Sequence, residues 1–537
     1  MDKIEIEKTG NFWIDNGIVA LYKILRKTGY SADLNASTLT VSTENNNGKS
    51  VEDILNHAKE EVVKFYLTKT NSAGWIYKEG RFEIYRKTDF KMHLKSFFKG
   101  KKPTTEGALY TPDVEDEKLG ATGKRMTPEV FQEFNKFKSE KSPVIIGDKR
   151  VTLTNKNKGF VNNPPKYEIG NDFSEDFLSG GNKLCLFSGK RFRKTNTITG
   201  MNYPFLTGAS GELNFASQLD VKPAISALYD FVSLFSFYNL NYLLQDDLKN
   251  YFVLYDNNLK DLESFYDVIA ANINNLAKPD FCSFETQIIG TQYESESFFN
   301  FLLSVYAQVN QRIDRDKRRG ILFKKSVFTL SNDGNIFRDV KEYTSLNALF
   351  ELFDCFEDNG TDERSYREPF LNFVRYFNQR LDSGKYDTTW RNRLCSDILS
   401  FRSILKTVEW FMGEVKMKED RGNIIFLDKI IEIYNSKTQK IMKTEMVDIC
   451  KTVGNRIGAY CREKDDKGIL FSIRNAKSRT EFLNVLAETQ FRTEVSYSET
   501  FFKELPDDSQ WEEYKALVSI FAMNSFLFKD KKTIEKQ

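Results

Sequence analysis

The spacing of apolar residues changes along this chain, and the change limits the folds that it can adopt. In residues 31–45 and 75–87 apolar and polar side chains alternate, which predicts strands. The second segment contains Glu79-Gly80, which predicts a hairpin turn. Residues 12–26 and 51–68 have helical spacing instead. The first part of the chain is therefore expected to mix helices and strands.

Helical spacing dominates after Asp220. One apolar stripe predicts a helix over residues 223–235, with Pro223 in its first turn. Residues 327–330 predict a strand, and residues 346–417 are again helical. After a break at 419–423, several amphipathic helices follow.

These patterns predict an α+β fold. A mixed, loop-rich α/β domain is expected over residues 1–340, and its segment from about 98 to 180 is irregular apart from a short helix near 128–138. A helical connecting region is expected over 341–416 and an all-α C-terminal bundle over 417–537. The first domain is the predicted nucleic-acid-binding part of the chain.

Composition narrows the functions that this chain can have. The 537 residues are 40% hydrophobic and 29% charged, which is typical of a globular protein. Only two histidines, His57 and His93, accompany 46 Phe and 24 Tyr, so a histidine-based catalytic or metal site is nearly excluded. Lys and Arg total 78 against 76 Asp and Glu. Any affinity for nucleic acid must therefore come from clustered charge.

The cysteines and the apolar runs predict a cytoplasmic protein that is not inserted in a membrane. The six cysteines have no repeating spacing and are expected to be free thiols in a reducing compartment. No apolar run approaches the roughly 20 residues that a membrane-spanning helix needs.

Motifs for catalysis are missing from the sequence. Gly48-Lys49-Ser50 lacks the first glycine of a phosphate-binding loop, because Thr43 stands at that position. No Gly-x-Ser-x-Gly, His-Glu-x-x-His or paired Cys-x-x-Cys occurs. Cys185 and Ser188 outline half of a zinc knuckle, but a hydroxyl is a poor zinc ligand. We expect a protein that is not an enzyme and that holds no cofactor or metal.

The segment from 183 to 215 combines three chemistries that a nucleic-acid-reading loop needs. Four cations, expected on phosphates, lie within five residues, and no acid occurs between Asp176 and Glu212. The cations are Lys190, Arg191, Arg193 and Lys194. Candidate base or sugar contacts are Asn202, Thr207, Ser210 and Asn214, and the aromatic candidates are Tyr203 and Phe205. The alternative is a solvated basic hairpin followed by a glycine-rich connection.

Three further basic clusters favour a nucleic-acid partner, although each alone is also compatible with a solvated face. The first is interleaved with phenylalanines, as expected of a single-strand RNA or DNA site, and consists of Lys91, Lys95, Lys99, Lys101 and Lys102. The second begins with Lys149 and Arg150. The third includes Arg315, Lys317, Arg318 and Arg319.

The order of these features resembles a known protein family. The opening FWIDNGIVALYKIL, the turn KLCLFSGKR, the following NYPFLTG and NF, and the helical C-terminal bundle resemble the large subunit of type I CRISPR Cascade, most like subtype I-B. The match rests on the order of these features along almost the whole chain. Relatives often carry a paired-cysteine zinc motif where this chain has Cys185 with Ser188.

The resemblance implies a non-catalytic subunit of an antiviral ribonucleoprotein. Such a subunit sits at the 5′ handle of the CRISPR RNA (crRNA), recognises the protospacer-adjacent motif in double-stranded DNA and starts strand separation. It also contacts the other Cascade backbone and small subunits and helps to recruit a helicase-nuclease. On this interpretation, residues 190–214 with Lys149 and Arg150 contact the DNA motif, Tyr203 or Phe205 acts as the wedge, and the Lys91–Lys102 cluster holds RNA. Two alternatives are a scaffold that acts through protein contacts only and a cryptic metal-dependent nuclease.

A second product from the same message is also expected. Gly413-Glu414-Val415 can be encoded as a purine-rich ribosome-binding sequence just before Met417. Subtype I-B relatives use an internal start in this gene, so residues 417–537 would form a small subunit. Its cations would line the DNA-binding channel, and they are Lys443, Lys451, Arg456, Arg462, Arg474, Lys477 and Arg479. Arg315, Lys317, Arg318 and Arg319 are also expected to bind a DNA strand.

Overall fold

The computed structural model divides into two compact units that interleave in sequence. Unit 1 comprises residues 1–242, 251–283 and 324–343, and unit 2 comprises residues 243–250, 284–323 and 344–537. The structure describes residues 2–68, 72–78, 81–87, 108–110, 124–125, 128–146, 149–152, 159–161, 179–198, 203, 224–244, 249–270, 282–322, 324–332, 337–358, 364–419, 421–438, 444–493, 496–497, 499–504 and 510–528.

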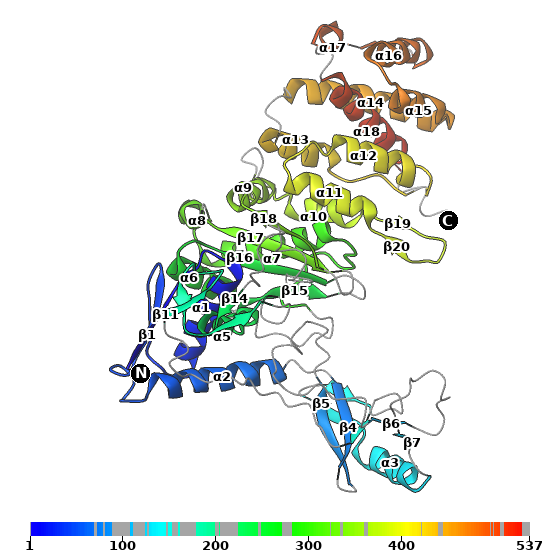
Figure 1. Ribbon diagram of the computed structural model, residues 1–537. Helices are drawn as coiled ribbons and strands as arrows, with labels where there is room; N and C mark the ends of the chain where they lie inside the picture. Colours follow the sequence, from blue (N-terminus) through cyan, green and yellow to red (C-terminus); the bar gives the residue numbers. More distant parts are fainter. Residues whose placement is uncertain are drawn as a thin grey trace, which may run out of the picture. The chain divides into compact units, whose positions relative to one another are not determined.

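Helix α1 (Phe12–Lys27) lies in the core of unit 1 (Figure 1). The Asn11 side chain caps its N-terminus by accepting the backbone N–H groups of Trp13 and Ile14 at 3.0 and 3.2 Å. Most of the helix is buried, including the polar Asp15 and Asn16. The helices that pack against it are α2 (Val51–Thr68), α5 (Ala227–Ser233), η5 (Ser236–Asn239) and α6 (Leu259–Ala270).

Two further sheets have three and four strands. The first is antiparallel, has the order β1-β3-β2, and consists of β1 (Lys3–Glu7), β2 (Asp33–Leu34) and β3 (Thr38–Ser42). Alternate residues of β1 and β3 are buried, as expected of strands with one face on a core. The second sheet has the order β15-β16-β17-β18 and consists of β15 (Asn241–Leu244), β16 (Lys249–Tyr255), β17 (Ser326–Asn332) and β18 (Phe337–Tyr343).

A separate five-stranded sheet with the order β5-β4-β10-β6-β7 belongs to unit 1. Its strands are β4 (Ser72–Lys78), β5 (Arg81–Lys87), β6 (Ala108–Tyr110), β7 (Lys124–Arg125) and β10 (Gly159–Val161). Helix α3 (Pro128–Lys141) packs on it, since the Phe82 ring lies 5.4 Å from Phe134 and 5.5 Å from Phe137. Strands β8 (Val144–Ile146) and β9 (Lys149–Val151) form a hairpin after α3.

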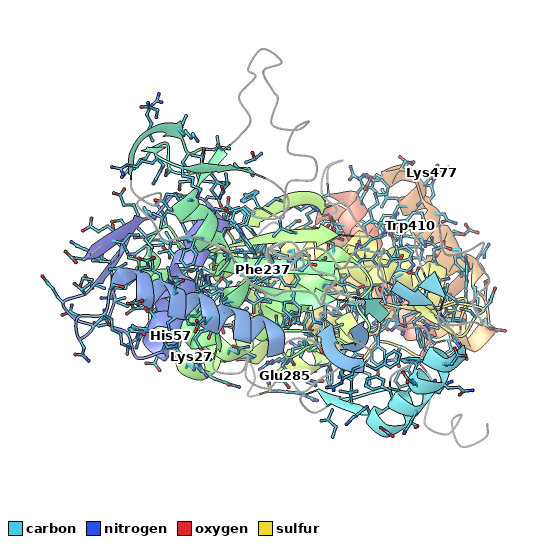
Figure 2. The ribbon with its side chains drawn as sticks, turned by 60° about the horizontal axis from the view of Figure 1, so that its bottom comes forward. Lys27, His57, Phe237, Glu285, Trp410 and Lys477 are labelled. Carbon is cyan, nitrogen blue, oxygen red and sulfur yellow. The ribbon has the colours of Figure 1, made fainter. Side chains whose placement is uncertain are left out.

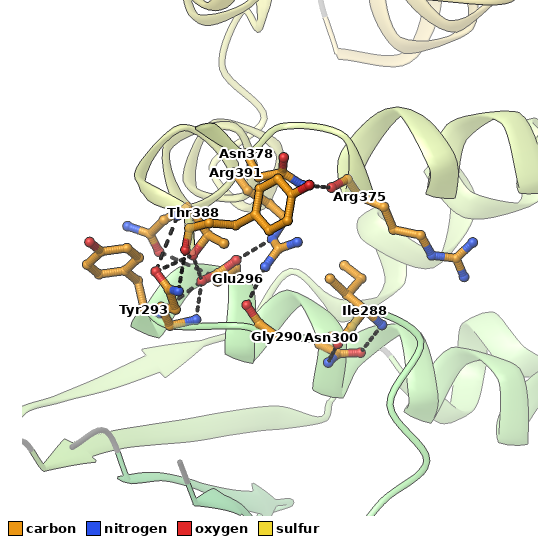
Figure 3. Close-up of polar contacts among 12 residues, drawn as sticks. Ile288, Gly290, Tyr293, Glu296, Asn300, Arg375, Asn378, Thr388 and Arg391 are labelled. Atoms are coloured by element: carbon orange, nitrogen blue, oxygen red, sulfur yellow. Dashed lines mark hydrogen bonds and ion pairs between the residues drawn. The ribbon is translucent and has the colours of Figure 1, made fainter. Parts of the chain in front are cut away.

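A buried ion pair joins two helices of unit 2, α7 (Glu294–Arg312) and α11 (Thr389–Leu399). Glu296 pairs with Arg391 and also accepts the Thr388 hydroxyl at 2.5 Å and the Tyr293 N–H at 2.9 Å (Figure 3). Arg391 donates a second bond to the Gly290 carbonyl at 2.6 Å. Because both charges are almost completely removed from water, the pair requires these additional hydrogen bonds.

The remaining elements of unit 2 are mostly helices. Before and after α11 they are α8 (Arg315–Leu322), α9 (Leu346–Glu357), α10 (Arg367–Arg375), the ladder of β19 (Gln379–Arg380) and β20 (Tyr386–Asp387), α12 (Leu405–Phe411) and the π-helical turn η6 (Met412–Lys416). They continue with α13 (Leu427–Thr438), α14 (Thr444–Lys464), α15 (Gly468–Asn475), α16 (Arg479–Thr493), α17 (Glu499–Glu504) and α18 (Trp511–Phe526).

Helices α14 and α18 approach each other closely because two glycines of α14 carry no side chain. A Cβ atom at Gly458 would lie 2.2 Å from the Ala522 carbonyl oxygen, and one at Gly454 would lie 2.6 Å from that of Val518. Neither oxygen is at the end of a flexible side chain, so the backbones would have to separate.

The predicted fold class is confirmed: the chain is α+β, with sheets toward its N-terminus and a helical C-terminal region. Helices α1 and α2 and the β4–β5 hairpin closely match their predicted segments. The predicted domain boundaries stay predictions, but residues 344–416 and 417–537 both belong to unit 2. Among the described residues, no helix is long and apolar enough to cross a membrane.

The helix predicted over residues 223–235 begins later than expected. Residues 224–226 instead form strand β14 (Ala224–Ser226), which pairs with β13 (Thr195–Thr197). The hydroxyl of Ser226 accepts the Tyr229 N–H at 3.2 Å, so the N-cap stands after the strand and α5 starts at Ala227. The apolar stripe alone could not separate Ile225, a strand residue, from the helix that follows it.

Replacing Gly458 with Ala should destabilise unit 2 by about 1–3 kcal/mol, because the new methyl group forces α14 away from α18. Gly320→Ala in α8 is the matched control, since nothing lies within 4 Å of a Cβ there. Hydrogen–deuterium exchange of the α14 and α18 amides measures the effect. Faster exchange is expected for Gly458→Ala only, and equal protection in both variants would contradict the close approach.

Candidate nucleic-acid interface

The four cations predicted to bind DNA lie on a short hairpin, residues 179–194, which we call the basic hairpin. Strand β11 (Ser179–Leu184) pairs antiparallel with β12 (Arg191–Phe192), with Leu184 opposite Arg191. The turn between them is closed by the Cys185 N–H, which donates to the Lys190 carbonyl at 2.9 Å, and by the Gly189 N–H, which donates to the Cys185 carbonyl at 3.0 Å. Gly189 has a φ of +65°, a conformation that favours glycine.

Buried side chains and backbone pairing fix the basic hairpin to the core of unit 1. Cys185 and Phe192 are buried, and the Phe192 ring meets Tyr229 of α5 edge-on at 6.0 Å. The Leu186 N–H donates to the Ala224 carbonyl at 2.8 Å, and the Ala227 N–H donates to the Lys194 carbonyl at 3.2 Å. The exposed cations are therefore carried by a structured backbone, which lowers the conformational entropy lost on binding.

The connection between β1 and α1 contacts the basic hairpin and its surroundings. Glu7 forms an ion pair with Lys190 at 2.6 Å, and its carbonyl accepts the Tyr229 hydroxyl at 2.8 Å. Asn11, the cap of α1, donates its side-chain N–H to the Tyr203 hydroxyl at 3.2 Å. Burial raises the pKa of Tyr203, whose ring also contacts Phe187 at 5.1 Å. Tyr203, one of the two predicted wedges, is thus held against the protein rather than projecting from it.

All four cations of the basic hairpin are exposed. Lys190 shares its charge with Glu7, and both side chains are about half exposed. Arg191 donates to the Asn182 carbonyl at 2.8 Å, which orients its guanidinium without neutralising it. The hairpin therefore exposes four cations, and Glu7 reduces the positive charge at Lys190.

Two exposed leucines lie among these cations. Leu184 is 53% exposed and Leu186 is 52% exposed, whereas Cys185 between them is completely buried. Leu184 is the last residue of β11 and Leu186 lies in the turn after it, and both are directed outward, whereas Cys185 is directed inward. Sequence reasoning missed Leu184, Leu186 and Glu7: the run Leu184 to Phe187 is uniformly apolar, and no local pattern relates Glu7 to Lys190.

The helical cations predicted to contact DNA are largely occupied within unit 2. Arg318 is buried, pairs with Asp354, donates to Asn310 at 3.1 Å and lies over the Tyr306 ring. Arg474 is likewise buried, where it pairs with Glu414 and stacks on Trp410 at 4.7 Å. Neither guanidinium can reach a phosphate in this conformation, so we remove both from the predicted contacts.

The other predicted cations whose side chains are described are at least partly exposed, and several of them pair with acids. Arg315 faces Asp354, Glu357 and Asp358 at 3.4–3.6 Å, Lys317 pairs with Asp314, and Lys451 pairs with Asp428. Arg462 donates to the carbonyls of Ser525 and Phe528, and Arg479 is partly buried. The side chains of Arg456 and Lys477 are exposed and form no ion pair among the described residues, and the Lys477 backbone N–H donates to the Glu481 carboxylate at 2.6 Å. These two are the best placed of the C-terminal cations for an external anion.

Many predicted site residues lie outside the described residues. They are Asn202, Phe205, Thr207, Ser210, Asn214, the RNA cluster Lys91, Lys95, Lys99, Lys101 and Lys102, and Lys443. The backbones of Lys149 and Arg150 lie in β9 and that of Arg319 in α8, but their side chains are not described. Met417 is described, and it is buried at the end of η6.

Within the described part of the chain, no group of three or more His, Cys, Asp or Glu residues could hold a metal ion. The turn that outlines half a zinc knuckle is closed by hydrogen bonds, and in one of them the Lys190 N–H donates to the Ser188 hydroxyl at 3.3 Å.

Comparison with protein-family models and with curated proteins found no match to this chain.

Glu7 should weaken the binding of DNA, because a phosphate must compete with its carboxylate for Lys190. We expect Glu7→Gln to bind a short DNA duplex about two- to five-fold more tightly at low salt, the range of an exposed ion pair. Glu5→Gln is the matched control, since Glu5 lies on the same exposed face of β1 and pairs with Lys3 at 2.6 Å. Titration by fluorescence anisotropy measures the difference. Equal affinities of the two variants would show that Glu7 does not restrain the hairpin.

Proposed function

We propose that this chain is the non-catalytic large subunit of a type I-B CRISPR RNA-guided surveillance complex. The observation that carries the proposal is the basic hairpin, a rigid element with four exposed cations and two exposed leucines. Binding and opening a duplex needs cations for the phosphates and apolar or polar groups for the bases, and it needs no cleavage chemistry. The segment that resembles the Cascade large subunit, KLCLFSGKR, is the sequence that forms this hairpin.

In this proposal, the basic hairpin approaches the duplex at the protospacer-adjacent motif. Lys190, Arg191, Arg193 and Lys194 contact phosphates, and Leu184 and Leu186 take the apolar role first predicted for Tyr203. Asn202 and Asn214, which follow the hairpin in sequence, contact base edges. The Lys91–Lys102 cluster binds the crRNA 5′ handle, and a separate helicase-nuclease supplies the cleavage.

The internal start at Met417 stays part of the proposal, and the structure adds a consequence to it. Helix α12 packs against α18, and both η6 and α12 precede Met417. A product of residues 417–537 would therefore lack the helix that covers this side of α18 in the full chain. Such a small subunit would need another chain to cover the exposed apolar side chains.

The test replaces Lys190, Arg191, Arg193 and Lys194 with Gln in the full chain. Each lost phosphate contact lowers the salt dependence of binding, so the slope of log K against log salt should become shallower by about three to four units. Affinity should fall alike for duplexes with and without the motif, because phosphates carry no sequence information. Anisotropy titrations at several salt concentrations give both quantities.

The control removes four cations elsewhere, the exposed Lys3, Lys418 and Arg492 and the partly buried Lys429, which all pair with neighbouring acids. It changes the net charge equally and should leave the slope unchanged. Equal losses in both variants would indicate only a general charge effect. A wild-type chain that binds no duplex at low salt would contradict the proposed function and leave the scaffold alternative.

A further inference from the structure

Three side chains of different chemistry meet in unit 1 in a cluster separate from the basic hairpin. The Tyr30 hydroxyl lies 2.9 Å from His57 Nδ1, and Lys49 Nζ donates to the Tyr30 oxygen at 3.3 Å. Tyr30 follows α1, Lys49 precedes α2, and His57 lies on α2, the blue helix in Figure 2. Of the two histidines in the chain, His57 is the one whose position is described. The three residues form a hydrogen-bonded chain across three segments.

The loop that carries Lys49 is held in place by a buried asparagine. Asn46 accepts the Ser31 N–H at 2.8 Å and donates to the carbonyls of Ser31 and Ser42 at 2.9 and 2.8 Å. Asn47 and Gly48 then adopt left-handed conformations, with φ of +55° and +72°. Two consecutive residues of this kind turn the chain sharply before Lys49, whose N–H donates to the Asn46 carbonyl at 3.1 Å. Lys49 is thereby fixed next to Tyr30, the neighbour of Ser31.

Hydrogen-bonding capacity determines what this cluster offers to solvent. An ammonium group has no acceptor, so the Tyr30 oxygen must accept from Lys49. In one tautomer of His57 the Tyr30 hydroxyl donates its proton to Nδ1 in a hydrogen bond, and the ring proton is on Nε2. In the other tautomer the tyrosine proton is free instead. In either case an N–H of Lys49 and a second N–H or O–H donor remain for a ligand.

No carboxylate among the described residues pairs with the lysine of this cluster. Lys3 and Lys190 both pair with carboxylates at 2.6 Å, whereas the exposed Lys49 has only the Tyr30 side chain as a partner within the described residues. No partner of His57 Nε2 is found there either. The nearest preceding acid on α2, Asp53, accepts the Ser50 hydroxyl at 2.7 Å. A cation with adjacent N–H donors is suited to an oxyanion.

We propose that Lys49, Tyr30 and His57 form a binding site for a phosphate group. Lys49 supplies the charge, His57 Nε2 or the Tyr30 hydroxyl supplies the second hydrogen bond, and Tyr30 holds the two outer groups in position. The phosphate belongs either to a free monoester or to the backbone of a single-stranded nucleic acid. This site does not depend on the proposed function, since none of its residues belongs to the basic hairpin.

The two histidines make a direct test possible. In the full chain labelled with isotopes only at histidine, the imidazole signals arise from His57 and His93, and a His57→Asn variant assigns them. Inorganic phosphate is titrated at constant pH and ionic strength. The His57 signal should shift and saturate in the millimolar range. A short RNA that shifts the His57 signal at much lower concentration would identify the nucleic-acid backbone as the source.

Variants separate this site from a general effect of salt. Lys49→Gln should raise the phosphate concentration at half-saturation of the His57 shift about ten-fold, as expected for loss of a charged hydrogen-bond donor. Tyr30→Phe should raise this concentration less. Lys59→Gln, on the same helix but two residues beyond His57, is the matched control and should behave like wild type. Unchanged far-ultraviolet circular dichroism verifies that each variant is folded. No saturable shift of His57, or the same shift in Lys49→Gln, would overturn the proposal.

Discussion

The close packing of α1 is the constraint on which unit 1 depends. At Gly17 a Cβ atom would lie 2.4 Å from the Val232 carbonyl oxygen, so α1 and α5 can approach only because this residue is glycine. Asn16 donates to the Leu254 carbonyl at 2.7 Å, and the Ser236 hydroxyl donates to the Trp13 carbonyl at 2.6 Å. These buried polar bonds fix the rotation of α1 as well as its position, because a rotated helix would leave them unmade.

The fixed N-terminus of α1 in turn positions the candidate interface. Asp15, buried in the first turn, accepts the backbone N–H groups of Thr9 and Gly10 at 2.7 and 3.0 Å, and burial raises its pKa. The connection from β1 is thereby tied to the helix, with Glu7 on one side and the cap Asn11 on the other. Glu7 and Asn11 then reach Lys190 and Tyr203, residues that are far away in sequence. The core of the unit thus determines which groups of the basic hairpin face solvent.

The sequence predicted the local structure well where apolar spacing is regular. Helix α2 spans the predicted residues 51–68, because its apolar residues repeat at helical intervals without interruption. The sequence pattern could not predict that Arg318 and Arg474 are buried, because their partners Asp354 and Glu414 lie 36 and 60 positions away in the chain. A charge run is read from the sequence as exposed, whereas folding pairs some of its members internally. Each of the two units is assembled from several separate segments of the chain, and the sequence could not predict this either, because long-range contacts determine it.

The central claim is that this chain acts within an RNA-guided complex, and the RNA that copurifies with it tests the claim most directly. The chain is isolated from cells under native conditions, and the 5′ ends of the bound RNA are mapped by sequencing. A guide complex predicts one uniform 5′ end with a constant handle, followed by variable guide sequences. RNA with scattered 5′ ends, or no RNA at all, would contradict the claim.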